Sequence, residues 1–324
     1  MSYIVTGGAG FIGSAFLAKL NQLGITDALV VDNLDSSEKW KNLNGKRFAD
    51  YVHKDHFLER VENDVLPSGI EGIVHLGACS STTERNVDYL MHNNYYYSKV
   101  LAEYALKKKI RFVYASSAAT YGDGSLGYSD DHQLISKLRP LNPYGYTKNL
   151  VDLWALEEGH LDKICGIRFF NVYGPNEYHK GEQCSVVFKA WRTAKSGKSV
   201  QLFKSNSPQF KDGEQKRDFI YVKDCSEVLW RALQDKKLNG VFNLGTGKAR
   251  SWLDLARAVF AALKQKEAIE FVPMPENVSR QYQNFTEAKM EKLKAAGAFP
   301  THHSLEDGVR DYVVNYLEQP NQIL

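Results

Sequence analysis

The stretch Thr6-Gly7-Gly8-Ala9-Gly10-Phe11-Ile12-Gly13 directly continues the short apolar run Tyr3-Ile4-Val5-Thr6, and together they decide the fold. The apolar run predicts a buried strand, and the glycines predict a tight turn after it. Apolar side chains then recur at helical spacing, at Phe11, Ile12, Phe16, Leu17 and Leu20. Glycines between a strand and a helix let a pyrophosphate approach the backbone and the helix N-terminus closely. The stretch therefore predicts a dinucleotide-binding turn.

Short apolar strands alternate with helices along the first half of the chain. Further strands are predicted at 28–31, 72–76, 112–115, 164–170 and 241–244, and helices at 89–109, from Pro143 towards Gly159, and after Ser251. This alternation predicts an α/β fold, a Rossmann-type doubly wound parallel sheet with a smaller mixed α/β C-terminal substrate lobe. We expect the dinucleotide domain to span 1–171 with a return segment near 216–248, and the substrate lobe to span 172–215 and 249–324.

Composition excludes several classes of protein. The 324 residues include 41 basic and 38 acidic side chains, a net charge of +3 without a dominant basic cluster, which argues against nucleic-acid binding. No apolar window reaches the ~18 residues of a membrane span, and no signal peptide precedes the first strand. The four cysteines lack metal or redox spacing. We expect no metal site and a cytoplasmic location.

The end of the second strand bears on the choice of cofactor. Asp32 follows Gly13 by nineteen residues, where an acidic group accepts from ribose hydroxyls and favours NAD. Asn33 and Lys39 follow it, and Lys54 lies farther on. Cations at these positions could neutralise a 2′-phosphate. The residues alone leave NAD and NADP both open.

Tyr144 and Lys148 place a phenol and an ammonium one helical turn apart, on the same face of a helix. Such a pair can move a proton while a nicotinamide moves a hydride, with Ser117 holding the substrate oxygen. Lys148 is also positioned to bind the nicotinamide ribose. We expect the ammonium, with the nicotinamide charge, to lower the pKa of Tyr144. The pattern predicts redox chemistry on an alcohol.

These motifs together resemble the extended short-chain dehydrogenase/reductase family. The matching stretches are 6–13, 116–122 (SSAATYG), 144–148, 168–175 (RFFNVYGP) and 217–222 (RDFIYV). The series is typical of nucleotide-sugar epimerases and dehydratases. Four further stretches resemble the ADP-L-glycero-D-manno-heptose 6-epimerase family, namely 31–34 (VDNL), 75–84 (HLGACSSTTE), 93–95 (NNY) and 179–181 (HKG).

The resemblance implies a mechanism. A tightly bound NADP oxidises C6″ of an ADP-heptose to a transient aldehyde, and hydride returns to the opposite face, in a step of lipopolysaccharide inner-core biosynthesis. Inversion turns the carbonyl oxygen to a new place, so a second proton donor is needed there. Tyr144 matches the first base and Lys180 the second. The family also implies a homo-oligomer, often a pentamer.

The resemblance also assigns individual residues. It places at the cofactor the residues Gly7, Gly10, Phe11, Ile12, Gly13, Asp32, Asn33, Lys39, Lys54, Leu76, Gly77, Ala78, Cys79, Ser80, Asn93, Lys148, Val172 and Lys180. It places at the substrate Ser117, Asn171, Glu182, Lys189, Phe203, Lys204, Ser205, Asn206, Arg217 and Tyr282. Glu182 and Lys189 stand where family members carry Ser and His, and the segment 207–216 is longer than usual. A modified heptose donor therefore stays open.

Two alternatives follow from the same residues. One is a related hexose 4-epimerase or 4,6-dehydratase, although dehydratases carry Thr-Asp-Glu where this chain has Ser117-Ala118-Ala119. The other is a non-catalytic dinucleotide-binding regulator. An intact set of Ser117, Tyr144 and Lys148 argues against the regulator.

Overall fold

The computed structural model describes residues 1–279, 282–299 and 302–324. Its centre is a seven-stranded sheet of order β11-β6-β5-β4-β1-β2-β3, in which every pairing is parallel. The strands are β1 Tyr3–Thr6, β2 Leu29–Asp32, β3 Asp50–His53, β4 Gly72–His75, β5 Arg111–Ser117, β6 Cys165–Phe169 and β11 Gly240–Leu244. The order reverses between β1 and β4, so the predicted doubly wound Rossmann-type sheet is confirmed.

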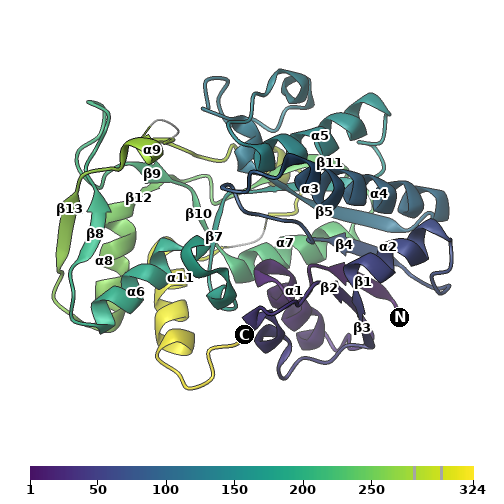
Figure 1. Ribbon diagram of the computed structural model, residues 1–324, viewed down its shortest axis with the longest axis horizontal. Coiled ribbons are helices and arrows are strands. Elements are labelled where there is room, and N and C mark those ends of the chain that lie inside the picture. The colour runs from purple at the N-terminus through teal and green to yellow at the C-terminus, as the bar shows by residue number, and fades with distance from the viewer. Residues whose placement is uncertain (280–281, 300–301) are drawn as a thin grey trace.

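Helices cover both faces of this sheet (Figure 1). One face packs on α1 Phe11–Gln22 and α7 Val222–Gln234, and the other on α2 Lys54–Glu62, α4 Tyr97–Lys108 and α5 Pro143–Glu157. The strands are short and almost continuously apolar because neither face meets water. Val5, Val30 and Val74 point to the α1 side, while Ile4 and Leu29 point to the α2 side.

The register of the sheet sets where the site forms. Thr6 at the end of β1 pairs with Val31 on β2 and His75 on β4. The strands are parallel, so the loops after β1, β2 and β4 leave the same edge. That edge, at the reversal of strand order, is where open α/β sheets bind ligands.

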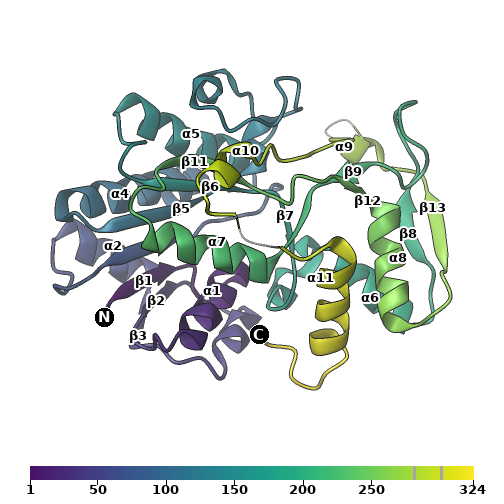
Figure 2. The same ribbon diagram turned by 180° about the vertical axis from the view of Figure 1, so that it is seen from behind.

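A second group of elements lies beside the sheet, at the left of Figure 1 and the right of Figure 2. Its helices α6 Val186–Lys195, α8 Trp252–Leu263 and α11 Leu305–Tyr312 pack together with the parallel pair β8 Val200–Phe203 and β13 Ile269–Val272. Two more small pairs connect the groups, β7 Asn171–Tyr173 with β10 Phe219–Tyr221 and β9 Lys216–Arg217 with β12 Arg250–Ser251. The predicted cap at Ser251 is present as a capping box with Asp254.

Short helical segments complete the chain. They are η1 Glu38–Leu43, α3 Val87–Leu90, η2 Met91–Tyr96, η3 Ala118–Tyr121, η4 His132–Lys137, η5 Tyr178–Gln183, α9 Glu276–Ser279, α10 Glu291–Ala295 and η6 Val313–Leu317. The helix predicted over 89–109 is interrupted, because η2 is a π-helical segment between α3 and α4. Strand β3 was not predicted. None of the helices in the described ranges is long and apolar enough to cross a membrane.

Candidate active site

In the glycine turn after β1, the backbone lies close to the backbone of the loop after β4 and of helix α1, as is typical of a phosphate-binding turn. Gly7 has φ +66°, and a Cβ there would lie 2.7 Å from the amide nitrogen of Gly77. A Cβ on Gly13 would lie 2.0 Å from the carbonyl oxygen of Gly7. Helix α1 begins after Gly10 without a side-chain cap, so its first amides and the positive end of its dipole are available to an anion. These features fit the pyrophosphate of a dinucleotide.

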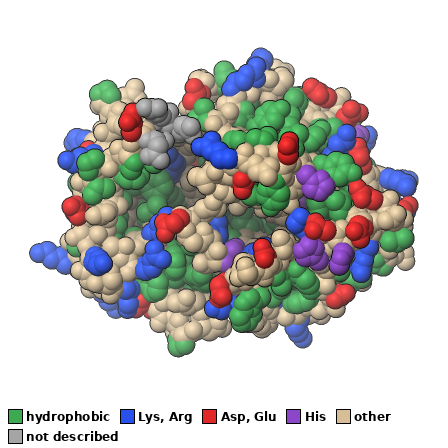
Figure 3. Space-filling model, in the orientation of Figure 1, with side chains coloured by type: hydrophobic (Ala, Val, Ile, Leu, Met, Phe, Trp, Pro, Cys, Tyr) green, Lys and Arg blue, Asp and Glu red, His purple; other side chains and the backbone are tan. Residues whose placement is uncertain are grey.

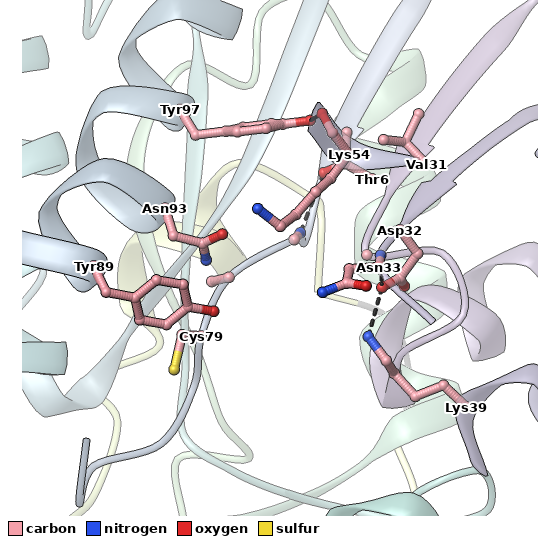
Figure 4. A pocket seen from close by; sticks show the side chains of 13 residues that line it. Thr6, Val31, Asp32, Asn33, Lys39, Lys54, Cys79, Tyr89, Asn93 and Tyr97 are labelled. Carbon is pink, nitrogen blue, oxygen red and sulfur yellow. Dashed lines mark hydrogen bonds and ion pairs between the residues drawn. The ribbon is translucent and has the colours of Figure 1, made fainter. Parts of the chain in front are cut away.

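A pocket opens beside this turn, between the loops that follow β1, β2 and β4 (Figure 4). Its wall contains many of the predicted cofactor residues, namely Gly7, Asp32, Asn33, Lys39, Lys54, Gly77, Ala78, Cys79 and Asn93. Thr6, Val31, Tyr89 and Tyr97 also line it, and sequence reasoning did not single them out. Gly10, Phe11, Ile12 and Gly13 form the neighbouring start of α1, and Leu76 and Ser80 flank the pocket residues of their loop.

Asp32 is buried and hydrogen-bonded on both carboxylate oxygens. One oxygen accepts from the backbone of Ala9 at 2.9 Å, and the other accepts from the backbone of Asn33 and from Lys39 Nζ, each at 2.7 Å. The dashed contacts in Figure 4 include the ion pair with Lys39. Lys39 therefore compensates the negative charge that would otherwise oppose a phosphate at this edge.

Asn94 is a site residue that sequence reasoning did not assign. Its amide oxygen accepts from Cys79 N at 2.9 Å, and its amide nitrogen donates to Cys79 O at 3.0 Å and to Thr147 Oγ1 at 3.2 Å. Asn94 lies in the π-helical segment η2 and is fully buried. It joins the loop after β4 to helix α5, which carries Tyr144. Only its place in the NNY stretch hinted at this role.

Tyr144 and Lys148 lie on the same helix, α5, and Ser117 on the neighbouring strand β5 interacts with Tyr144. Asn142 caps α5 through Gly145 N at 2.8 Å, and Pro143 begins the helix. Ser117, at the end of β5, hydrogen-bonds the hydroxyl of Tyr144. Lys148 is buried and donates to the carbonyl of Ala115 on β5 at 2.9 Å.

In the chain without a bound nicotinamide the pKa of Tyr144 is raised, and the lowering predicted for the ammonium together with the nicotinamide charge stays a prediction. Burial raises the pKa of Tyr144 above its ordinary value, and the hydrogen bond from Ser117 opposes this only in part. Burial also lowers the pKa of Lys148 to about 8, with nearby Asp152 acting in the opposite direction. Because Lys148 is turned to Ala115, its ammonium does not make the phenol more acidic.

A fully buried ion pair fixes the helix that carries these groups. Asp152 on α5 accepts from Tyr114 and Ser116 on β5, each at 2.9 Å, and from Arg168 Nε on β6 at 2.9 Å. Arg168 also lies 4.9 Å over the ring of Tyr121. Removing one partner would leave a buried charge unpaired, which is costly, so α5 is held in one register on the sheet.

Lys180 lies on segment η5. Its Nζ is 5.4 Å from the centre of the Phe11 ring at the start of α1. The structure therefore brings the predicted second base next to the glycine turn. No direct contact joins Lys180 and Tyr144 among the described residues.

Three predicted substrate residues form one aromatic cluster. The guanidinium of Arg217 lies 5.0 Å from the Tyr282 ring, and Phe203 packs edge-on against Tyr282 at 6.5 Å. Trp252, which was not predicted, lies 5.6 Å from the guanidinium and donates to the Tyr282 hydroxyl at 2.8 Å. Burial lowers the pKa of Arg217, and in the described contacts no carboxylate pairs with it. A buried guanidinium of this kind suits a diphosphate.

Figure 3 shows a hollow between the two groups of elements. The remaining predicted substrate residues, and Val172 of the predicted cofactor set, lie on several separate segments. Asn171 and Val172 lie on β7, and Lys204, Ser205 and Asn206 follow β8. Ser205 and Asn206 are held by Asp212 and Ser279 at 2.8 and 2.9 Å. Glu182 and Lys189 form an exposed ion pair of 3.4 Å on a separate segment, and they do not belong to the Arg217 cluster.

The fold and site define a class of protein. A dinucleotide pocket, a Ser–Tyr–Lys set and a buried arginine without a carboxylate partner among the described contacts are features of a nicotinamide-dependent enzyme that acts on an alcohol carbon of a phosphorylated compound. Tyr144, whose hydroxyl interacts with Ser117, supplies the proton part of that chemistry.

Comparison with known proteins narrows this class. Residues 3–245 match the profile of the NAD dependent epimerase/dehydratase family. An ADP-L-glycero-D-manno-heptose-6-epimerase of Nitratidesulfovibrio vulgaris is 55% identical over 99% of this chain and 100% of its own length. One from Fusobacterium nucleatum is 47% identical, covering 99% of each chain. The crystal structure of the Helicobacter pylori ADP-L-glycero-D-manno-heptose-6-epimerase superposes with a TM-score of 0.80 at 29% identity, covering 97% of this chain and 95% of that one.

The chain therefore belongs to the NAD-dependent epimerase/dehydratase family, among its ADP-L-glycero-D-manno-heptose-6-epimerases. It uses a nicotinamide dinucleotide cofactor. The resemblance drawn from the motifs is thereby confirmed.

Proposed function

We propose that the chain inverts C6″ of ADP-D-glycero-D-manno-heptose, giving ADP-L-glycero-D-manno-heptose for the inner core of lipopolysaccharide. The observation that carries this proposal is the 55% identity with the ADP-L-glycero-D-manno-heptose-6-epimerase of Nitratidesulfovibrio vulgaris, over that relative's full length. The proposed chemistry is transient oxidation at C6″ and re-reduction on the opposite face of the resulting aldehyde.

The bound nicotinamide supplies hydride acceptance and return. Ser117 holds the C6″ oxygen, and Tyr144 takes its proton through the hydrogen bond they share. After the aldehyde turns, its oxygen lies away from Tyr144 and needs a proton from another group. Lys180 fits that need, since it lies near the start of α1 and on a different segment from Tyr144.

NADP is our proposed cofactor. Lys39 neutralises Asp32 at 2.7 Å, and Lys54 lines the same pocket. A 2′-phosphate at this edge would meet these cations rather than a free carboxylate, since Asp32 already accepts from Ala9, Asn33 and Lys39. We propose that the other predicted cofactor residues in the wall of this pocket also contact the dinucleotide.

The proposed substrate site combines Arg217 with Tyr282, Phe203 and the Lys204–Asn206 segment. A guanidinium free of carboxylates favours the diphosphate, and the aromatic rings favour the adenosine. The exposed Glu182–Lys189 pair, together with Asn171 and Val172, is assigned to the sugar side.

The organisation of the enzyme is part of the proposal. We assign 1–171 and 216–248 to the cofactor domain and 172–215 and 249–324 to the substrate lobe. All four cysteines are free thiols, which supports a reducing cytoplasm as the place of work. We also propose a homo-oligomer, with the family's pentamer as the expected form.

One experiment tests the function. The nucleotide released from the purified protein by heat is identified, and the enzyme is then incubated with ADP-D-glycero-D-manno-heptose without added cofactor. The configuration at C6″ is followed by NMR. Appearance of the L-glycero epimer with NADP released supports the proposal, and released NADP without an epimer moves the substrate to another nucleotide sugar.

A further inference from the structure

The buried amide of Asn42 is one of the contacts that join the segment carrying Lys180 to the cofactor side of the molecule. Asn42 lies in η1 and is 2% exposed. Its Nδ2 donates to the carbonyl oxygens of Ala9 and Asn176, each at 3.0 Å, and lies 3.2 Å from Nδ1 of His179. An amide nitrogen carries two hydrogens, so the two carbonyls account for both.

Both carbonyls belong to segments with a proposed role in the reaction. Ala9 is part of the glycine turn, and its N–H donates to Asp32 at 2.9 Å. Asn176 lies two residues before η5, the segment that carries Lys180, and Lys180 contacts the Phe11 ring. Asn42 thus bridges the turn that faces the pyrophosphate and the segment that presents the second base.

A second set of contacts ties the two ends of the Lys180 segment together, through Glu177 before it and Ser185 after it. Glu177 is fully buried, and its carboxylate accepts from Ser185 Oγ at 2.6 Å and from Ser185 N at 2.5 Å, at the start of α6. Asn176 holds a left-handed backbone with φ +77°, an uncommon conformation that surrounding contacts must maintain. Its Nδ2 donates to Ser14 Oγ on α1 at 2.9 Å.

The helical segment η1 connects these contacts to the proposed 2′-phosphate site. It carries Lys39, which pairs with Asp32 at 2.7 Å, and three residues later Asn42. Burial, together with the charges of Lys39 and Lys180, lowers the pKa of His179 to about 4, so this neighbour is neutral near pH 7. A shift of η1 would therefore be felt at Lys180 through hydrogen bonds rather than through a titrating group.

We propose that Asn42 is a positioning residue that holds Lys180 in place for the second half of the reaction and couples its placement to the cofactor turn. The inference rests on the proposed function, in which Lys180 serves the turned aldehyde while Tyr144 serves the first oxidation. Asn42 itself takes no part in the proton transfer at Tyr144 or in the one at Lys180. Its loss should impair the step that needs Lys180 and spare the step that needs Tyr144.

The first measurement separates the oxidation that needs Tyr144 from the later step that needs Lys180, in the variants Asn42→Ala and Asn42→Asp. The aspartate keeps the shape of the side chain but lacks the amide donors. After rapid mixing with the ADP-heptose, reduction of the bound nicotinamide is followed by its near-ultraviolet absorbance, and the epimer by NMR. We expect epimer turnover to fall about 10²-fold, as for a reacting group displaced by an ångström, while the amplitude of nicotinamide reduction persists. Lys180→Ala should show the same division.

The second measurement does not depend on turnover. Hydrogen–deuterium exchange of a peptide covering 176–184 should be faster in both Asn42 variants than in the wild type, with cofactor bound. Lys41→Ala is the matched control, because Lys41 lies on η1 and its side chain contacts only the exposed Glu38 and Trp40 among the described contacts. It should leave both turnover and exchange unchanged.

The outcomes distinguish the inference from the function beneath it. Asn42 variants with wild-type turnover, or with nicotinamide reduction and epimer formation lost in parallel, would overturn the positioning role. Unchanged exchange over 176–184 would overturn it even if a variant were too unstable for kinetics. If the wild type forms no epimer, or Lys180→Ala forms it normally, the proposed two-base function fails instead.

Discussion

Tyr144 shows how far a local motif determines chemistry at the scale of single residues. Its spacing from Lys148 and the presence of Ser117 could be read from the sequence, and Ser117 does interact with Tyr144, while Lys148 contacts the carbonyl of Ala115. The direction of the pKa shift could not, because it depends on how much water the fold removes. Burial prevails over the serine hydrogen bond, and Lys148 is directed to the Ala115 carbonyl.

Replacing Tyr144 with Phe should remove the first proton transfer and leave the fold intact. We expect Tyr144→Phe to lower epimer formation at least about 10²-fold, since a phenyl ring cannot exchange a proton. NMR of C6″ measures this, and thermal unfolding checks the fold. Tyr146→Phe is the control, since Tyr146 lies on the same helix but is 47% exposed. Wild-type turnover of Tyr144→Phe would contradict the assigned role.

Lys148 should make stability depend on pH in the alkaline range. Burial lowers its folded pKa to about 8 from the ordinary 10.5, so between these values the unfolded chain binds more protons. The free energy of unfolding should therefore rise as pH increases from 8 to 10.5. We expect the wild type to gain up to about 3 kcal/mol relative to Lys148→Met over this window, measured by denaturant titration. Parallel pH profiles of the two proteins would contradict it.

Some site residues could not be found from the sequence because their partners are distant. Asn42 and the Asn176 carbonyl are separated by 134 positions, and Asn94 and Thr147 by 53. An asparagine in a polar stretch carries no local sign of such a bridge. Lys180 shows the same limit, since only family resemblance distinguished it from an exposed lysine.

At the scale of elements, burial on both faces made the central strands predictable. The run Tyr3–Thr6 was predicted with the bounds that β1 has, and Pro143 marked the start of α5. Strand β3 was missed because Asp50–His53 is short, polar and at the edge of the sheet. The π-helical segment η2 was missed because apolar periodicity does not distinguish it from an α-helix.

Helix α1 depends on a close approach that only glycine allows. The Cβ of an alanine at position 13 would lie 2.0 Å from the Gly7 carbonyl, so the helix would have to move away from the turn. We expect Gly13→Ala to lose the bound dinucleotide and to unfold at a lower temperature, as measured by nucleotide release and calorimetry. Gln22→Ala, at the exposed end of the same helix, is the control. Full cofactor content in Gly13→Ala would contradict this account.

At the scale of the whole molecule, the alternation of strands and helices predicted the doubly wound sheet. The sequence did not predict how the second group of elements packs beside this sheet. The cluster of Arg217, Trp252 and Tyr282 draws on β9, α8 and the segment after α9, whose proximity depends on long-range packing. The sequence alone therefore did not predict Trp252 as a member of this cluster.

Cofactor removal should weaken the whole protein, because the pocket lies where β1, β2 and β4 end. We expect protein stripped of nucleotide to have a lower Tm, and NADP to restore it more than NAD at equal concentration because of Lys39 and Lys54. Saturation at one hundred times Kd corresponds to about 2.7 kcal/mol. Lys39→Ala should reduce the advantage of NADP. Equal recovery with either nucleotide would contradict the proposed preference.

The position of β11 in the sheet has a consequence for synthesis on the ribosome. Strand β11 spans Gly240–Leu244 and pairs only with β6, whose own strand ends at Phe169. A nascent chain thus carries β6 as an open edge while about seventy more residues are made. An unpaired apolar edge invites pairing with other chains. Messages truncated before position 240 should therefore yield aggregates rather than a smaller folded domain.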